Sequence, residues 1–179
     1  MLGDRTNVTQ IILPQDMTLQ TSLIYSEALV KKAVLSFWWR VVGAKFIVAV
    51  VLLSFGLAYG FSVGEKSWLM GIYATILFFA ITFMVALYLI HYRNSIQKFK
   101  AMGNPQASLT LSTDSFSLSS GAGSATLPWS SVTEVWQFPD FWLFFFSKSQ
   151  FSTLPIANLS PEIQTFIIER INHAGGKVT

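Results

Sequence analysis

The sequence contains no cysteine, only two histidines and few charged residues. The lack of cysteine excludes a disulfide scaffold, a cysteine-based zinc or iron–sulfur site and a thiol nucleophile. His91 and His173 leave little material for metal binding or acid–base chemistry. Charged residues make up 12% of the chain and hydrophobic residues 52%, whereas a typical soluble domain has about 25% charged residues. This composition argues against an ordinary cytosolic protein.

Two further kinds of functional motif are missing as well. The chain has no Walker-type glycine loop and no His, Asp and Glu residues at metal-ligand spacing. We therefore expect a non-enzymatic protein with no catalytic residues, no cofactor and no metal.

Two long apolar runs, 46–64 and 67–90, contain no charged residue. A helix needs about 20 predominantly apolar residues to cross the hydrocarbon core of a membrane. The remaining chain is too short to wrap two such helices in a soluble fold, so the runs predict transmembrane helices at about 42–64 and 67–90. Because only Glu65 and Lys66 separate the runs, we expect an antiparallel hairpin over residues 41–92.

Basic residues flank the predicted hairpin on one side. They are Lys31, Lys32, Arg40 and Lys45 before the first span and Arg93, Lys98 and Lys100 after the second. Only Lys66 lies at the tip, so the positive-inside rule places both termini in the cytoplasm. These residues set the topology, or they also attract anionic lipid headgroups. Residues 104–179 carry five acidic and three basic residues, a net charge of −2, so the overall charge of +3 does not indicate a nucleic-acid partner.

Small residues recur along the two apolar runs, 46–64 and 67–90, which carry no Asp, Glu, Lys, Arg or His. The lack of ionisable groups argues against a transporter or pump. Gly56, Gly60 and Gly64 form a row of small residues four apart, and Gly71 lies in the second span. Such rows let helices approach closely. We expect packing within the hairpin, with a homo-oligomer or docking on another membrane protein as alternatives.

Residues 1–40 predict a short strand followed by an amphipathic helix. The strand is expected at 8–13, and Asp16 is a candidate helix cap. An apolar stripe with helical spacing then leads into the first span; its members are Leu19, Leu23, Val30, Val34 and Phe37.

Residues 104–179 alternate apolar and polar side chains over short stretches, which is typical of β-strands. We expect strands around 109–111, 116–118, 125–127, 132–138, 141–147 and 151–154. Ser160 as a cap, Pro161 at the first helical position and Glu162 in the first turn predict a closing helix that ends before Gly175. The pattern predicts an antiparallel sheet of five or six strands closed by one amphipathic helix.

Three stretches of this tail resemble the YcxB-like family of bacterial membrane proteins. Residues 127–135 (LPWSSVTEV) resemble the family's "lPW..v..v" strand, and residues 141–146 (FWLFFF) its hydrophobic strand. Leu154-Pro155 followed by Ser160-Pro161-Glu162 resembles its ending. The resemblance implies a cytoplasmic pleckstrin-homology-like domain attached to a helical hairpin in the bacterial inner membrane, and no catalytic residues. Residues 112–124 contain no Lys or Arg, which argues against phosphoinositide-type headgroup binding.

The stretch 141–146 is apolar on both faces of the expected strand. A half-exposed antiparallel strand normally alternates with polar residues. The second face must therefore be covered by the N-terminal helix, the membrane, another copy or a partner. Since tryptophan is enriched at binding hot spots, a partner surface is expected from five aromatic residues: Trp129, Trp136, Trp142, Phe144 and Phe146.

These observations favour an inner-membrane protein whose cytoplasmic domain binds a protein partner as an adaptor or regulator. One alternative is a self-assembling hairpin that uses the glycine row, or a membrane-stress or immunity-type protein. A membrane-surface sensor that binds lipid through the basic flanks is the other. Membrane lipid and either a protein partner or a second copy are thus the expected partners.

Overall fold

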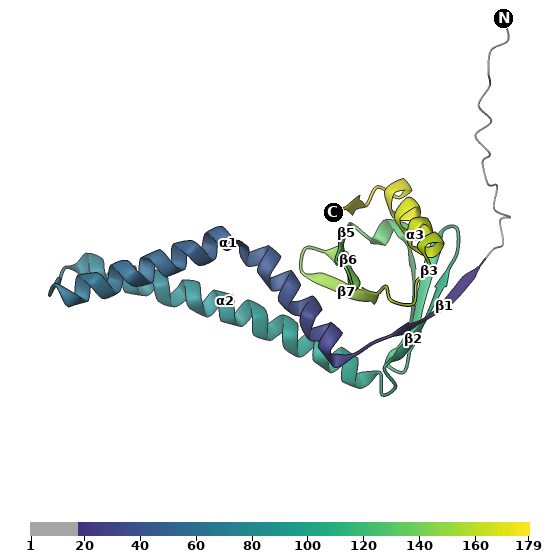
Figure 1. Cartoon of the computed structure of the whole chain (residues 1–179), viewed down its shortest axis with the longest axis horizontal. Coiled ribbons are helices and arrows are strands. Elements are labelled where there is room, and N and C mark those ends of the chain that lie inside the picture. The colour runs from purple at the N-terminus through teal and green to yellow at the C-terminus, as the bar shows by residue number, and fades with distance from the viewer. Residues whose placement is uncertain (1–17) are drawn as a thin grey trace, which may run out of the picture.

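The computed structural model describes residues 18–179, so the strand expected at 8–13 and the cap expected at Asp16 lie outside the described residues. Two long helices, α1 (Glu27–Ser62) and α2 (Trp68–Ala101), run antiparallel and project from a β domain (Figure 1). Both are long and apolar enough to cross a membrane, and their most apolar windows are not buried by the rest of the described chain.

The segment before α1 is a strand, which corrects the expected helix start. β1 (Leu19–Ile24) pairs antiparallel with β2 (Gln106–Leu111) from Leu19 opposite Leu111 to Ile24 opposite Gln106. Leu19 and Leu23 fit a period of two as well as a helical period, so their spacing alone was ambiguous. Helix α1 starts only after Ser26, whose side chain accepts a hydrogen bond from the Leu29 amide at 3.1 Å.

This pairing places the helical hairpin between two neighbouring strands. The Tyr25 amide donates to the Pro105 carbonyl at 2.8 Å, so the chain leaves the sheet at Tyr25 and returns beside it after both helices. The hairpin is therefore an insertion into the β1–β2 connection, and it is tied to the β domain at both ends.

The β domain consists of two four-stranded sheets rather than the single sheet of five or six strands expected. The first has the order β1-β2-β3-β4, with β3 at Ser115–Ser120 and β4 at Gly123–Pro128. A short 3-10 turn (Trp129–Ser131) separates it from the second sheet, of order β7-β6-β5-β8. The second sheet contains β5 (Glu134–Gln137), β6 (Phe141–Ser147), β7 (Gln150–Pro155) and β8 (Lys177–Val178).

The closing helix, α3 (Pro161–His173), is confirmed with its predicted cap: the Ser160 hydroxyl accepts from the Ile163 amide. Strand β8 follows α3 and pairs in parallel with β5, which the sequence did not predict because β8 has only two residues. The chain turns sharply at Gly176, where a Cβ would lie 2.7 Å from the Val132 carbonyl oxygen.

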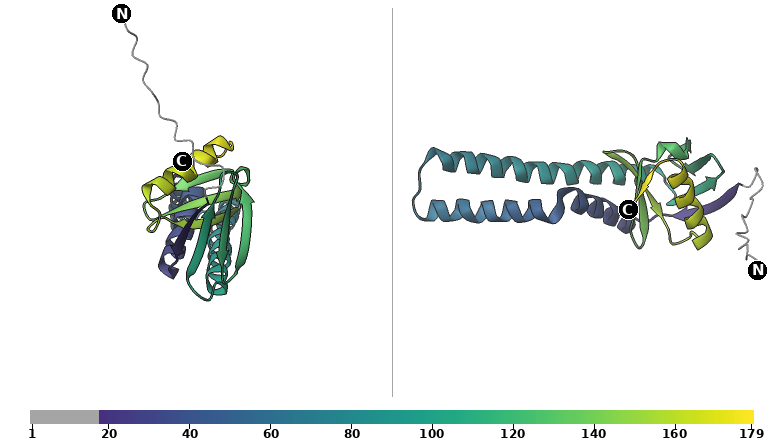
Figure 2. Two further views of the ribbon diagram at one scale, coloured as in Figure 1. Left: turned by 90° about the vertical axis from the view of Figure 1, so that its right-hand side faces the viewer. Right: turned by 90° about the horizontal axis from the view of Figure 1, so that it is seen from above.

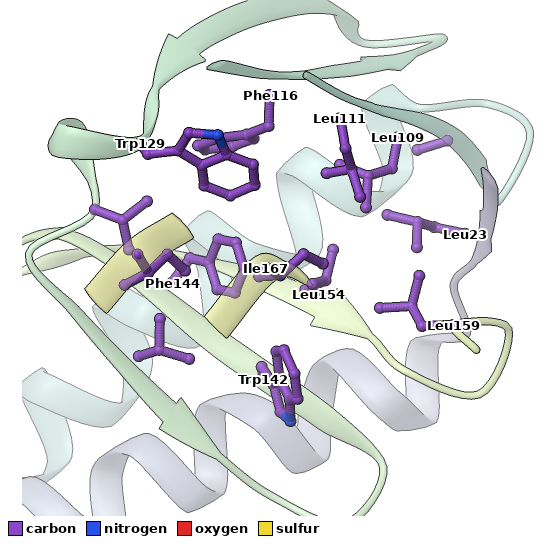
Figure 3. Close-up of a cluster of buried hydrophobic side chains, with 14 residues drawn as sticks. Leu23, Leu109, Leu111, Phe116, Trp129, Trp142, Phe144, Leu154, Leu159 and Ile167 are labelled. Atoms are coloured by element: carbon purple, nitrogen blue, oxygen red, sulfur yellow. The ribbon is translucent and has the colours of Figure 1, made fainter. Parts of the chain in front are cut away.

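Two apolar clusters hold these parts together. The larger lies between the two sheets and α3 and includes Leu23, Phe116, Trp129 and Ile167 (Figure 3). The smaller lies between β6 and the first turns of α1 and includes Ala33 and Phe37. Among residues 18–179, the structure buries no polar or charged residue. The smaller cluster packs α1 onto the outer face of the second sheet.

Candidate functional site

The aromatic strand β6 is covered on both faces by the chain itself. Trp142 and Phe144 point into the larger cluster between the sheets (Figure 3). Phe141, Leu143 and Phe145 point the other way and pack on α1, where Phe37 lies with its ring centroid 6.0 Å from that of Phe145. The sequence left four possibilities for covering the second face: the N-terminal helix, the membrane, another copy or a partner. In the structure the first turns of α1 cover it.

This packing corrects the partner surface expected from the sequence. Trp129 is 3% exposed, Trp142 4% and Phe144 2%. The Trp129 indole donates to the Ser112 carbonyl at 3.1 Å, so its polar atom also has a partner within the chain. Phe146 is half-buried against the same cluster. Aromatic residues are common both in protein cores and in interfaces, so the sequence alone did not distinguish the two. In the structure these residues belong to the core or pack against it.

The fifth residue of that set, Trp136, is half-buried and contacts α1. The Arg40 guanidinium lies 4.3 Å from the centroid of the indole ring. Arg40 Nη2 also donates to Thr179 Oγ1 at 2.9 Å, and the Trp136 indole donates to Glu134 Oε1 at 2.7 Å. Arg40 therefore connects α1 to β5 and β8, which adds an intramolecular role to the flank position expected from the sequence.

The other basic flank residues divide into paired and exposed ones. Lys31 forms an ion pair with Glu27 on the same helix at 2.7 Å, and Lys32 pairs with Asp140 in the β5–β6 turn. The remaining four are exposed, one on α1 and three on the last turns of α2: Lys45, Arg93, Lys98 and Lys100. Near the end of α2, Arg93 and Lys100 lie on one side of the helix and Lys98 on the opposite side.

The glycine row does not act as one surface within the hairpin. A Cβ at Gly60 would lie 2.8 Å from Met70 Sδ of α2, so the end of this flexible side chain would have to shift. At Gly56 and Gly71 a Cβ would meet nothing within 4 Å. Gly64 lies beyond the end of α1 with φ +77°, so it serves the turn rather than helix packing. Only Gly60 of the four packs within the described hairpin.

A cleft of about 360 Å³ opens where α2 leaves the apolar part of the hairpin. Its walls come from the last turns of α2, the β3–β4 hairpin, β7 and the start of α1. Hydroxyl-bearing side chains line the rim over an apolar floor, and Lys98 is the one charged residue of the lining. The apolar part of the lining includes Val30, Phe99, Leu118 and Phe151, and the polar part includes Ser95, Lys98 and Ser119. We call this the α2 cleft.

Tyr25 and Gly121 hold the walls of the α2 cleft together. The Tyr25 hydroxyl donates to the Thr153 carbonyl on β7 at 3.0 Å, and burial raises the pKa of this phenol to about 12. Gly121 sits against the backbone of Met102 just after α2, where a Cβ would lie 2.9 Å from the Met102 carbonyl carbon. Glycine at this turn therefore lets the β3–β4 hairpin approach the end of α2.

The chemistry of the α2 cleft is that of binding. One ammonium group, several hydroxyl groups and an apolar floor can hold an extended segment with an anionic group. Among residues 18–179, no group of three or more His, Asp or Glu side chains could hold a metal ion. The sequence offered no signal for this cleft, because its walls come from segments far apart in the chain.

Comparison with known proteins agrees with the resemblance seen in the sequence. Residues 111–168 match the model of the YcxB-like protein family, from the end of β2 to α3. The match begins after the hairpin, so it covers most of the β domain and neither long helix. No curated protein and no solved structure gave a significant match.

Proposed function

With the YcxB-like match of the β domain as the premise, we propose that this chain is a non-enzymatic protein of the bacterial inner membrane that binds a protein partner on its cytoplasmic side. The two long apolar helices support a membrane hairpin. The basic residues around its open end support a cytoplasmic position for both termini and for the β domain.

We further propose that the β domain has a pleckstrin-homology-like fold. Two mainly antiparallel sheets that enclose one core, with a helix closing that core, support this assignment. In that arrangement the apolar hairpin occupies the β1–β2 connection. It thereby brings the end of α2 to the rim of the domain, where the α2 cleft lies.

The single observation that carries the proposal is the α2 cleft. Three of the five residues of the expected aromatic partner surface are buried and two are half-buried, whereas this cleft is open and lies at the basic end of the proposed membrane hairpin. Its apolar floor fits a hydrophobic side chain, and Lys98 fits a carboxylate of the partner. No acidic residue lines the cleft, so the cation keeps its full attraction for an anionic group. The partner is therefore an extended protein segment with an apolar and an acidic residue.

Site-specific crosslinking tests this binding site. Because the chain has no cysteine, Ser120→Cys, on the strand face that it shares with Leu118, places one thiol in the cleft for a bifunctional crosslinker in native membranes. We expect a discrete adduct with a second protein. Lys98→Glu should lower its yield about tenfold, since a lost charge-assisted contact is worth about 1.5–3 kcal/mol.

Two matched controls make the result specific. Lys100→Glu changes the same charge on the same helix outside the cleft lining and should leave the adduct in place. Ser130→Cys, which is exposed on the 3-10 turn, should not give it. An adduct that ignores the charge of residue 98, or equal labelling from the Ser130→Cys variant, would contradict a partner site in the α2 cleft.

The exposed basic residues around the end of α2 favour anionic lipid as a second candidate ligand. Arg93, Lys98 and Lys100 lie just beyond the apolar part of the helix, where lipid phosphates are found. Lipid binding through these residues would depend on all three charges and weaken steeply with salt. Nanodiscs that contain phosphatidylglycerol test this ligand. The wild-type protein should retain more anionic lipid than a variant in which all three basic residues are replaced by Gln.

A further inference from the structure

The outer edge of β4 is open to pairing with another strand over residues 124–126, before the proline at its end. β4 is the last strand of its sheet, and among residues 18–179 no strand pairs with its outer side. Its sequence, GSATLP, contains no charged residue, and its register with β3 runs from Ser115–Pro128 to Ser120–Gly123 without a bulge. Five of its six residues are exposed. Natural edge strands usually carry charges, bulges or early prolines that prevent such pairing.

The hydrogen bonds of the sheet show which backbone groups face outward. The Trp129 amide donates to the Asp114 carbonyl at 3.3 Å, just beyond the Ser115–Pro128 pair. Antiparallel pairs alternate between bonded and non-bonded positions. The outward-facing groups of β4 are therefore those of Ser124, Thr126 and Pro128. Pro128 has no amide hydrogen, so the open edge reduces to Ser124 and Thr126, one residue on each side of Ala125.

The orientation of this sheet suits a second copy in the same membrane. Seen along the helices, the strands of the first sheet lie side by side with their broad face toward the viewer (Figure 2, left). The sheet thus lies across the direction of α1 and α2. When two copies of one strand pair antiparallel, the two-fold axis stands perpendicular to the sheet. This axis would run along the helices, so both apolar hairpins would point the same way.

We propose that β4 pairs with β4 of a second copy of this chain, with Ala125 at the two-fold axis. Ser124 then lies opposite Thr126 of the second copy, and each such pair exchanges two backbone hydrogen bonds. The neutral strand brings no like charges together, and the facing hydroxyl side chains of Ser124 and Thr126 are a favourable cross-strand pair. The result is a continuous eight-stranded sheet. Ser124 and Ala125 also belong to the lining of the α2 cleft, but the pairing itself requires no partner in that cleft.

Cysteine crosslinking in membranes tests the position of the axis. In the proposed dimer, residue 125 faces its own copy at a non-bonded position, with Cβ atoms about 4.5–5.5 Å apart. Ala125→Cys should therefore form a disulfide-linked dimer rapidly on mild oxidation of the full-length protein. The control, Ala122→Cys, lies in the β3–β4 turn. Its two copies would be about 20 Å apart, at about 3.3 Å for each of six strand residues, and should not crosslink.

Charge substitution at the same position provides the second arm. Ala125→Lys and Ala125→Glu should each give monomers in mild detergent, because like charges would face each other across the axis. Co-expression of the two variants should restore a mixed dimer. The proposal is overturned if residues 122 and 125 crosslink equally or if neither crosslinks. It is also overturned by a dimer that Ala125→Lys leaves intact, or by a disulfide from the Ala125→Cys variant to a different protein.

Discussion

At the residue scale, Tyr25 shows how a single side chain supports the junction between hairpin and β domain. It follows β1 directly, its amide pairs with the strand that returns after both helices, and its hydroxyl donates to β7. The ring packs on the larger apolar cluster, which raises the pKa of the phenol to about 12. The folded protein therefore resists ionisation of this group more than the unfolded chain does.

This resistance predicts a loss of stability at alkaline pH. Between pH 10 and 12 the unfolded chain releases the Tyr25 proton while the folded chain keeps it, so the free energy of unfolding falls as pH rises through this window. The difference in tyrosinate absorbance between the wild type and Tyr25→Phe should have its midpoint near pH 12. The variant should lose less stability over the same range. A midpoint near pH 10, the ordinary value for a tyrosine, would show that the ring is not enclosed.

At the element scale, Gly56 and Gly60 in the second half of α1 have different surroundings. Gly60 faces Met70 of α2, and Gly56 faces no other part of the described chain within 4 Å of a Cβ. We predict that Gly60→Leu lowers the thermal stability of the purified protein, because overpacking costs about 1–3 kcal/mol. Gly56→Leu should leave that stability unchanged, as its side chain enters open space.

Mass measurement of the same two variants separates packing from self-assembly. The structure uses Gly60 within one hairpin, so the oligomeric state should survive Gly60→Leu. A self-association that depended on the glycine row would instead be sensitive to Gly56→Leu. Dissociation of an oligomer by Gly56→Leu alone would contradict the assignment of self-pairing to β4.

The elements also show where the sequence was informative. Ser160, Pro161 and Glu162 predicted the start of α3 because capping is a local effect. Alternating side chains located the strands from β2 to β7 for the same reason. Leu19 and Leu23 fitted two periods, and only the pairing with β2, which lies beyond both long helices in the sequence, decides for a strand. The α2 cleft and the split into two sheets also depend on such distant contacts, which no local pattern contains.

At the scale of the whole molecule, the first turns of α1 join the apolar hairpin to the β domain. Phe37 is 2% exposed and lies among Trp136, Phe145 and Phe151 of the second sheet and His91 of α2. Further along the same helix, Gly43 takes φ +73° and ψ 147° and bends α1. Only glycine adopts this conformation readily. The bend lets α1 follow the β domain first and α2 afterwards.

We therefore predict that Phe37→Ala uncouples the two parts without unfolding either. Truncation of a buried phenylalanine costs about 3–5 kcal/mol, and here that loss falls on the interface between α1 and β6. Amide hydrogen exchange in residues 141–147 should increase strongly, while exchange in the apolar part of α2 stays slow. Trp39→Ala is the matched control, because this side chain is 56% exposed on the same helix. If Phe37→Ala left exchange in β6 unchanged, the larger cluster alone would hold the domain together, and the hairpin would not position the α2 cleft through this contact.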